Sequence, residues 1–137
     1  GVLCVTATDK RELRSWYSNT PIKPDLLSVA APGGSGLVGL CFEDIVSTVP
    51  PGTGLDGCGY PANQAYDEYA GTSMAAPHAA GVVALVASMG CSREQSIDIV
   101  TASARQPFTN LRGAWTPAYG YGIVDAAAAV QAAQSGC

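Results

Sequence analysis

The chain has 137 residues, a length typical of a single domain, and 47% of them are hydrophobic, which suffices for a core and argues against disorder. Charged residues make up only 13% and the net charge is −4, without a basic cluster, so we expect no nucleic-acid partner. No apolar run approaches the roughly 18 residues that a membrane-spanning helix needs, so we expect no membrane partner either.

Three short strands are predicted in the N-terminal part of the chain. The first, over residues 2–8, is apolar and rich in β-branched residues, and we expect it to be buried on both faces. The polar segment 9–24 should be a surface excursion. Further strands are predicted over 26–31 and 45–49, because each of these apolar runs is stopped by a cluster of Pro and Gly.

Three helices are predicted in the C-terminal part. The first spans about 73–89. The second begins at Ser92, where Ser92 and Gln95 form a capping-box pattern. The third is capped by Asp125 and extends to about Ala133. Since we find neither a linker nor an internal repeat, we expect a single structural unit.

Five cysteines are many for a cytosolic chain of this size; they stand at positions 4, 41, 58, 91 and 137. None belongs to a CxxC pair, and one histidine cannot complete a zinc site of ordinary spacing. We therefore expect a secreted protein with disulfide bonds. The sequence does not select among the possible pairings, although Cys41 and Cys58 flank the third predicted strand and could pair. The cysteine left over could bridge to an upstream segment.

The strongest functional signal is the segment 71–81, Gly-Thr-Ser-Met-Ala-Ala-Pro-His-Ala-Ala-Gly. A serine hydroxyl at its ordinary pKa is a poor nucleophile and needs a suitable setting. Gly71 has no side chain, so a substrate backbone could lie close to it. Thr72 is a natural N-cap, which would place Ser73 in the first helical turn, where backbone N–H groups and the helix dipole favour an oxyanion. The alternative is that these residues are only a capped helix start.

Three neighbours of Ser73 complete this motif. Pro77 cannot donate to the Ser73 carbonyl, which loosens the helix at the candidate nucleophile. His78 lies five residues after Ser73, roughly 140° around the helix, so we expect a structural histidine packed in the helix rather than a catalytic base. Met74 should fill a gap beside the serine, where its oxidation would reduce activity. Because no histidine precedes Ser73, the chain carries a nucleophile without a base.

The segment 71–81 resembles, almost residue for residue, the nucleophile motif of the subtilisin-like serine proteases, the subtilases. Other segments resemble the same family in the family's own order; they are residues 5–9, 14–19, 27–33, 45–50 and 119–126. The implied fold is α/β, part of a subtilisin-like three-layer fold with a mostly parallel sheet flanked by helices.

The resemblance also indicates what lies outside this sequence. The family's triad Asp and His and its oxyanion asparagine all lie upstream of the strand at residue 2, so residues 1–137 resemble the C-terminal half of one catalytic domain. We expect an excised or mature segment of a longer precursor, incomplete without an upstream N-terminal half as a second chain. Residues around 34–44 are an insertion, which we expect to form a disulfide-braced surface loop. No cofactor or metal is required for the chemistry. The resemblance allows structural calcium in the full enzyme but not readily in this half, because Ser28 stands where many members have an Asp that some use to hold calcium.

The function implied is the nucleophile-bearing part of a secreted serine endopeptidase. Ser73 would attack a carbonyl of a peptide or protein substrate, and its backbone N–H, supported by Gly71 and Thr72, would hold the oxyanion of the acyl-transfer step. We expect the chain alone to be inactive, because the members of a triad act as a unit. The alternative is an inert fragment or a binding module that retains the fold. The sequence does not determine the substrate specificity.

Overall fold

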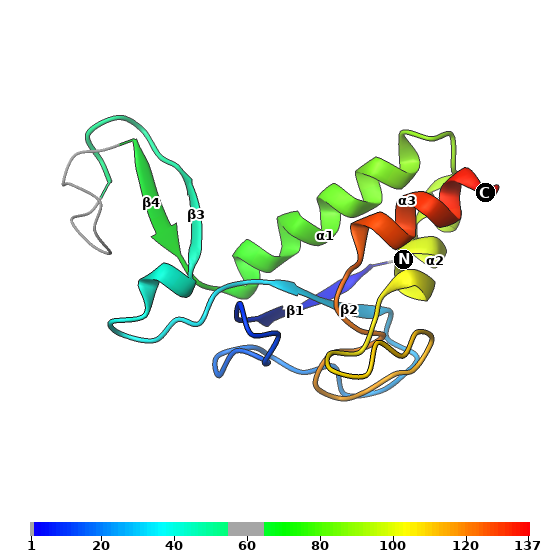
Figure 1. Ribbon diagram of the computed structural model, residues 1–137, viewed down its shortest axis with the longest axis horizontal. Coiled ribbons are helices and arrows are strands. Elements are labelled where there is room, and N and C mark those ends of the chain that lie inside the picture. The colour runs from blue at the N-terminus through cyan, green and yellow to red at the C-terminus, as the bar shows by residue number, and fades with distance from the viewer. Residues whose placement is uncertain (1, 55–64) are drawn as a thin grey trace.

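A computed structural model describes residues 2–54 and 65–137. In these residues the strands are β1 (Cys4–Thr8), β2 (Ser28–Pro32), β3 (Ile45–Thr48) and β4 (Tyr66–Tyr69), and the helices are the 3-10 helix η1 (Cys41–Glu43), α1 (Thr72–Ala87), α2 (Arg93–Ser103) and α3 (Ala126–Gln134). Figure 1 shows α1 lying along β1 and β2, with α2 and α3 near one end of α1 and the β3–β4 hairpin beyond the other end.

The strands β1 and β2 form a parallel pair with Cys4 opposite Ser28 and Thr8 opposite Pro32. On the other side of β2, Ala30 makes a further parallel bridge to Ile123, which lies just before α3. The predicted α/β class, with a small parallel sheet flanked by helices, is confirmed. Parallel pairing requires a long crossover, and the segment between β1 and β2 supplies it.

The outer edge of β1 has no partner strand in the described part of the chain. Thr6, Ala7 and Thr8 are buried, but Cys4 is exposed and Val2 is 79% exposed. The predicted burial of residues 2–8 therefore holds for Thr6–Thr8 and not for the start of the segment, where no strand among the described residues lies beside β1. An open apolar groove of about 430 Å³ follows this edge.

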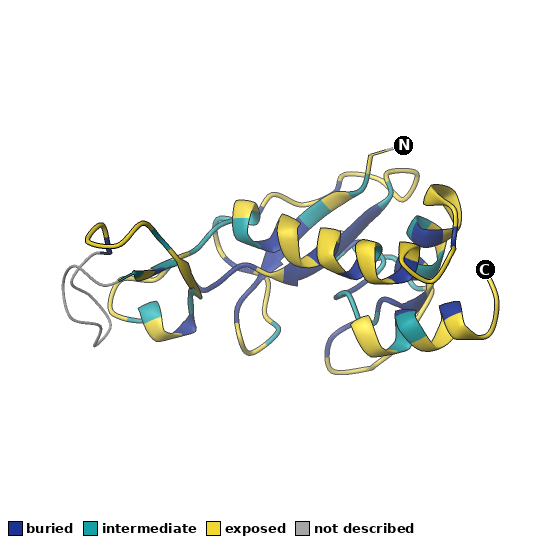
Figure 2. Cartoon of the chain, turned by 90° about the horizontal axis from the view of Figure 1, so that it is seen from above, coloured by how far each residue is buried: buried dark blue, intermediate teal, exposed yellow. Residues whose placement is uncertain are grey.

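The core consists of two clusters of mostly small side chains on either end of α1. Small residues allow α1 to approach the sheet closely, since few side-chain atoms separate the two backbones. One cluster joins α1 to the parallel strands and contains Ala7, Val29, Ala31, Ala75, Ala79 and Ala104. The other joins α1 to α2 and α3 and contains Val82, Val86, Cys91, Val100, Ala129 and Ala133. Figure 2 shows that α1 also presents a long exposed face away from this core.

The predicted starts of the last two helices are confirmed. Ser92 and Gln95 form the complete capping box of α2, with bonds in both directions. The carboxylate of Asp125 caps α3 by accepting the Ala128 N–H at 3.0 Å. Both caps satisfy backbone donors that have no partner within the helix.

A disulfide between Cys91 and Cys137 joins the start of α2 to the residues after α3. The predicted use of disulfide bonds is thereby confirmed, and this pairing is one that the sequence alone did not select. Cys4 forms no disulfide among the described residues. The proposed partner of Cys41 is Cys58, which lies outside the described residues, so that pairing stays a prediction.

The segment 9–24 is less superficial than predicted, because several of its polar side chains turn inward. Asp9 is buried and its carboxylate accepts the N–H groups of Arg11 and Leu13 at 2.8 and 3.0 Å. The buried Ser18 hydroxyl accepts the N–H of Ala7 at 2.8 Å. These polar groups stay inside since they satisfy backbone donors that would otherwise be unpaired. In the described part of the chain, no helix combines the length and apolar character needed to cross a bilayer.

Candidate active site

The start of α1 places the candidate nucleophile. Gly71 is the N-cap in extended backbone, and its carbonyl accepts the N–H groups of Met74 and Ala75 at 3.0 and 3.2 Å. The prediction of Thr72 as the N-cap is therefore wrong by one residue, because Thr72 already has helical geometry and no side-chain cap bond is formed. Ser73 is the second residue of α1, and the first N–H groups of a helix have no carbonyl in a preceding turn to bond. Ser73 therefore lies in the first turn of α1, as predicted, and the role of its N–H toward an oxyanion stays a prediction.

Ser73 is exposed and lines an open cavity of about 380 Å³. Met74, Pro77 and His78 line the same cavity from α1, and residues 45–47 of β3 form the facing wall. A volume of this size suits a short stretch of peptide or a small ligand. The sequence predicted a strand over residues 45–49, but it did not predict that this strand lies opposite Ser73. That arrangement depends on how the β3–β4 hairpin packs against α1.

Gly71 is not required by packing within the described chain. A Cβ atom built there would lie 3.5 Å from the Met74 sulfur and 3.6 Å from the Ser73 nitrogen, which are ordinary contacts. A methyl group would therefore fit at Gly71 in ordinary contact with these two atoms. The predicted approach of a substrate backbone to Gly71 stays a prediction.

Pro77 and His78 shape the helix on the far side of the serine. Pro77 lies inside α1 and has no N–H, so the Ser73 carbonyl lacks its usual helical donor. The Nδ1 atom of His78 lies 2.8 Å from the Met74 carbonyl oxygen and, because a carbonyl only accepts, Nδ1 carries the proton. No hydrogen bond joins His78 to Ser73 in the described part of the chain. The predicted packing of His78 is wrong, however, because its ring is exposed in the open cavity.

Acidic groups gather at the base of the hairpin. Burial, together with the charges of Asp67 and Asp44, raises the pKa of Glu68, and the Asp67 carboxylate also raises the pKa of Tyr69. Sequence reasoning missed these residues and the strand β4, because Tyr-Asp-Glu-Tyr shows no alternation of polar and apolar residues. Pairing with β3 determines this strand.

Among the described residues, no group of three or more His, Cys, Asp or Glu side chains is placed to hold a metal ion.

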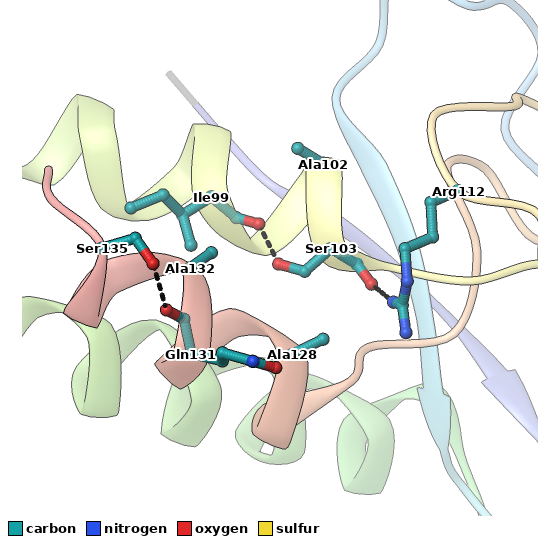
Figure 3. A pocket seen from close by; sticks show the side chains of 8 residues that line it. All are labelled: Ile99, Ala102, Ser103, Arg112, Ala128, Gln131, Ala132 and Ser135. Carbon is teal, nitrogen blue, oxygen red and sulfur yellow. Dashed lines mark hydrogen bonds between the residues drawn. The ribbon is translucent and has the colours of Figure 1, made fainter.

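A larger cavity, of about 500 Å³, lies between α2 and α3 and is shown in Figure 3. Its charged side chain, Arg112, donates to the Ser103 carbonyl and, at 2.7 Å, to the Asp125 carboxylate. The hydroxyls of Ser103 and Ser135 donate to carbonyls of their own helices. These polar groups already form hydrogen bonds within the protein, so they are less available to bind or activate a ligand than the Ser73 hydroxyl.

The model of the subtilase family matches residues 1–122 of the chain. The chain belongs to the subtilase family. It is 38% identical over 135 residues to an extracellular protease of Xanthomonas campestris pv. campestris, covering 98% of this chain and 20% of that protein. It is 35% identical over 137 residues to the extracellular basic protease of Dichelobacter nodosus, covering 96% of this chain and 19% of that protein. The chain therefore spans about a fifth of the length of these subtilase relatives.

Solved protease structures share the fold of this subtilase chain. A protease of Pseudoalteromonas arctica PAMC 21717 matches with a TM-score of 0.73 and 34% identity over 96% of this chain and 36% of that one. A lanthipeptide protease matches with a TM-score of 0.73 and 28% identity over 96% of this chain and 41% of that one. The predicted family and the partial subtilisin-like fold are thus confirmed, whereas the roles of the individual site residues stay predictions.

Proposed function

We propose that this chain is the nucleophile-bearing portion of a secreted serine endopeptidase. The observation that carries the proposal is the position of Ser73, exposed at the N-terminal end of α1 and facing an open cavity. An activated serine needs access to substrate and a donor-rich backbone, and the start of a helix offers both.

In the proposed reaction, Ser73 Oγ bonds to the carbonyl carbon of the scissile peptide while its proton passes to a histidine outside this sequence. The C–N bond then breaks, the amine leaves with that proton, and water hydrolyses the resulting ester on Ser73. The Ser73 N–H donates to the oxyanion during both steps. An upstream segment or second chain supplies the histidine, the aspartate that orients it and an asparagine as the second oxyanion donor.

The absence of a side chain at Gly71 and the missing donor at Pro77 support this assignment. The first lets a substrate backbone lie close beside the nucleophile. The second leaves the Ser73 carbonyl without its helical bond, an arrangement that costs stability and that an ordinary helix start would not need. We propose a secreted enzyme because the similar proteases are named as extracellular and a disulfide joins Cys91 to Cys137.

The second candidate is a catalytically inert fragment that keeps the fold. It is favoured by one observation: His78, the single histidine of this sequence, bonds the Met74 carbonyl and not Ser73. Under this alternative the cavity at Ser73 would bind peptides without cleaving them.

Hydrolysis of a protein substrate by Ser73→Ala and Ser88→Ala variants separates the two candidates. Ser88 is an exposed serine at the opposite end of α1 and does not line the Ser73 cavity, so Ser88→Ala is a matched control. In the protease completed by its upstream half, we expect Ser73→Ala to lower kcat by more than about 10⁴-fold and Ser88→Ala to change it little. The isolated chain should not hydrolyse the substrate measurably. Equal rates for Ser73→Ala and the unaltered protein would refute the proposal.

A further inference from the structure

The carbonyl groups of Gly33 and Gly34, which directly follow β2, are held by side chains from the crossover segment. The hydroxyl of Tyr17 donates to the Gly33 carbonyl at 2.6 Å and shares its proton with the Gly34 carbonyl at 2.8 Å. The buried hydroxyl of Ser15 also donates to the Gly34 carbonyl, at 2.7 Å. Two side chains thus fix the orientation of two consecutive peptide groups.

The Gly33 carbonyl has a second donor, which lies at the candidate active site. The N–H of Gly71 donates to it at 2.8 Å. Gly71 is the N-cap of α1 and stands two residues before Ser73. Tyr17 and the N-cap of the nucleophile helix therefore meet on one oxygen atom, although they are far apart in the sequence.

This junction is tightly enclosed. A Cβ atom built on Gly33 would lie 2.5 Å from the Ala7 Cβ and 2.8 Å from the Gly71 oxygen. Burial of the phenol is the largest influence on Tyr17 and raises its pKa, while hydrogen bonding to Ser15 and the Gly71 backbone offsets part of that effect. The hydroxyl therefore stays protonated, and a donor, through the neutral pH range.

The Asp44 carboxylate accepts the Gly36 N–H at 2.9 Å. Gly34, Gly36 and Asp44 all belong to the insertion around 34–44, so residues 33–36 are held both by the crossover segment and by a bond within the insertion. A backbone held at several points leaves the Gly33 carbonyl little freedom to rotate away from Gly71.

We propose that Tyr17 is a positioning residue for Ser73, acting through the Gly33 carbonyl and the Gly71 amide to fix the first turn of α1. Its catalytic consequence rests on the proposed function of Ser73, whereas its effect on Gly71 does not. Small displacements of a nucleophile are costly, because attack requires close alignment with the substrate carbonyl.

The test is Tyr17→Phe, introduced into the protease completed by its upstream half. The variant keeps the ring, and both acceptors keep a donor, Gly33 from Gly71 and Gly34 from Ser15, so no buried carbonyl is left unsatisfied and the fold is retained. We expect amide hydrogen exchange at Gly71, whose N–H bonds the Gly33 carbonyl, to accelerate about tenfold and kcat to fall about 10- to 100-fold, with KM within about twofold.

The control is Trp16→Phe in the neighbouring aromatic residue. Trp16 is 68% exposed and its ring N–H reaches the Gly36 carbonyl at a longer 3.3 Å, away from Gly71. We expect its exchange rate at Gly71 and its kcat to match those of the unaltered protein. A role of Tyr17 confined to stability would lower the unfolding midpoint and leave both kcat and the exchange at Gly71 unchanged, which would overturn the proposal.

Failure of the proposed function is distinguishable from failure of this inference. If the completed protein does not hydrolyse peptides, or if Ser73→Ala hydrolyses them as fast as the unaltered protein, the proposed function fails. Hydrogen exchange at Gly71 still decides the role of Tyr17. Faster exchange in Tyr17→Phe alone, and not in Trp16→Phe, would then support the positioning of Gly71. Unchanged exchange in both variants would refute it.

Discussion

Removal of the Cys91–Cys137 disulfide is expected to weaken the packing of α2 and α3 on α1. The bridge joins residues separated by 46 positions whose Cα atoms lie 5.3 Å apart. Cys91 is buried in the same cluster as Val86, Val100 and Ala133. The double variant Cys91→Ala and Cys137→Ala removes the crosslink and keeps a small apolar group at the buried position.

The magnitude follows from the loop that the bridge closes. In the chain-entropy account, closing a loop of this length destabilises the unfolded state by about 4 kcal/mol, and measured values are commonly about 2–4 kcal/mol. The lost sulfur at Cys91 adds about 1 kcal/mol of buried apolar contact. We therefore expect the free energy of unfolding to fall by about 3–5 kcal/mol, a large share of the stability of an ordinary domain.

Urea unfolding of the oxidised protein and of the double variant measures this difference. The matched control is Cys4→Ala, because Cys4 is exposed and forms no disulfide among the described residues. We expect that control to change the free energy of unfolding by less than about 0.5 kcal/mol. A loss below about 1 kcal/mol in the double variant, with an unchanged denaturant slope, would refute the loop-closure reasoning.

Two further predictions concern stability: one rests on the close packing around Gly33 and the other on the carboxylates of Glu12 and Asp125. Gly33→Ala should destabilise the protein by about 1–3 kcal/mol in thermal unfolding, because the new methyl group would overlap the Ala7 side chain and the Gly71 carbonyl, and an unchanged midpoint would contradict the packing described. The pKa of Glu12 is lowered from 4.5, mainly by its hydrogen bond to Arg105, and that of Asp125 from 3.8, mainly by the Ala128 N–H. Since both pKa values are lowered in the folded state, the stabilisation by these two carboxylates is complete above about pH 5 and is lost as the pH falls through the folded-state pKa values. The midpoint of thermal unfolding should therefore decline below about pH 4.5. Glu12→Gln should reduce that decline.

The sequence was sufficient where local chemistry determines structure. Ser92 and Asp125 cap their helices as predicted, because an oxygen at the N-cap satisfies backbone donors whatever the rest of the fold does. The parallel strands were also foreseen, since their β-branched and apolar residues are stopped by Pro and Gly. The N-cap of α1 was displaced by one residue, because the extended backbone of Gly71 supplies the first helical acceptor and leaves the Thr72 side chain unused.

Features that depend on packing between distant segments were not predictable. The strand β4 is polar and is held in place by β3, and the inward turn of Asp9 and Ser18 follows from backbone donors that only the folded chain brings near them. The motif was sufficient to identify Ser73 as the candidate nucleophile, but it did not indicate that residues 45–47 of β3 line the cavity opposite it. The shared acceptor at Gly33 joins Tyr17 to Gly71 across the fold, and no spacing in the sequence indicates it.

The most direct test of Ser73 is labelling with a fluorophosphonate probe, followed by identification of the modified peptide. Such a probe reacts with a serine that a positioned base has activated, so it reports the assembled site independently of substrate preference. In the protein kept in its native assembly, we expect a single label on Ser73 and none on Ser73→Ala. Well-folded native protein that takes no label at Ser73 would contradict the account, and the inert-fragment alternative would replace it.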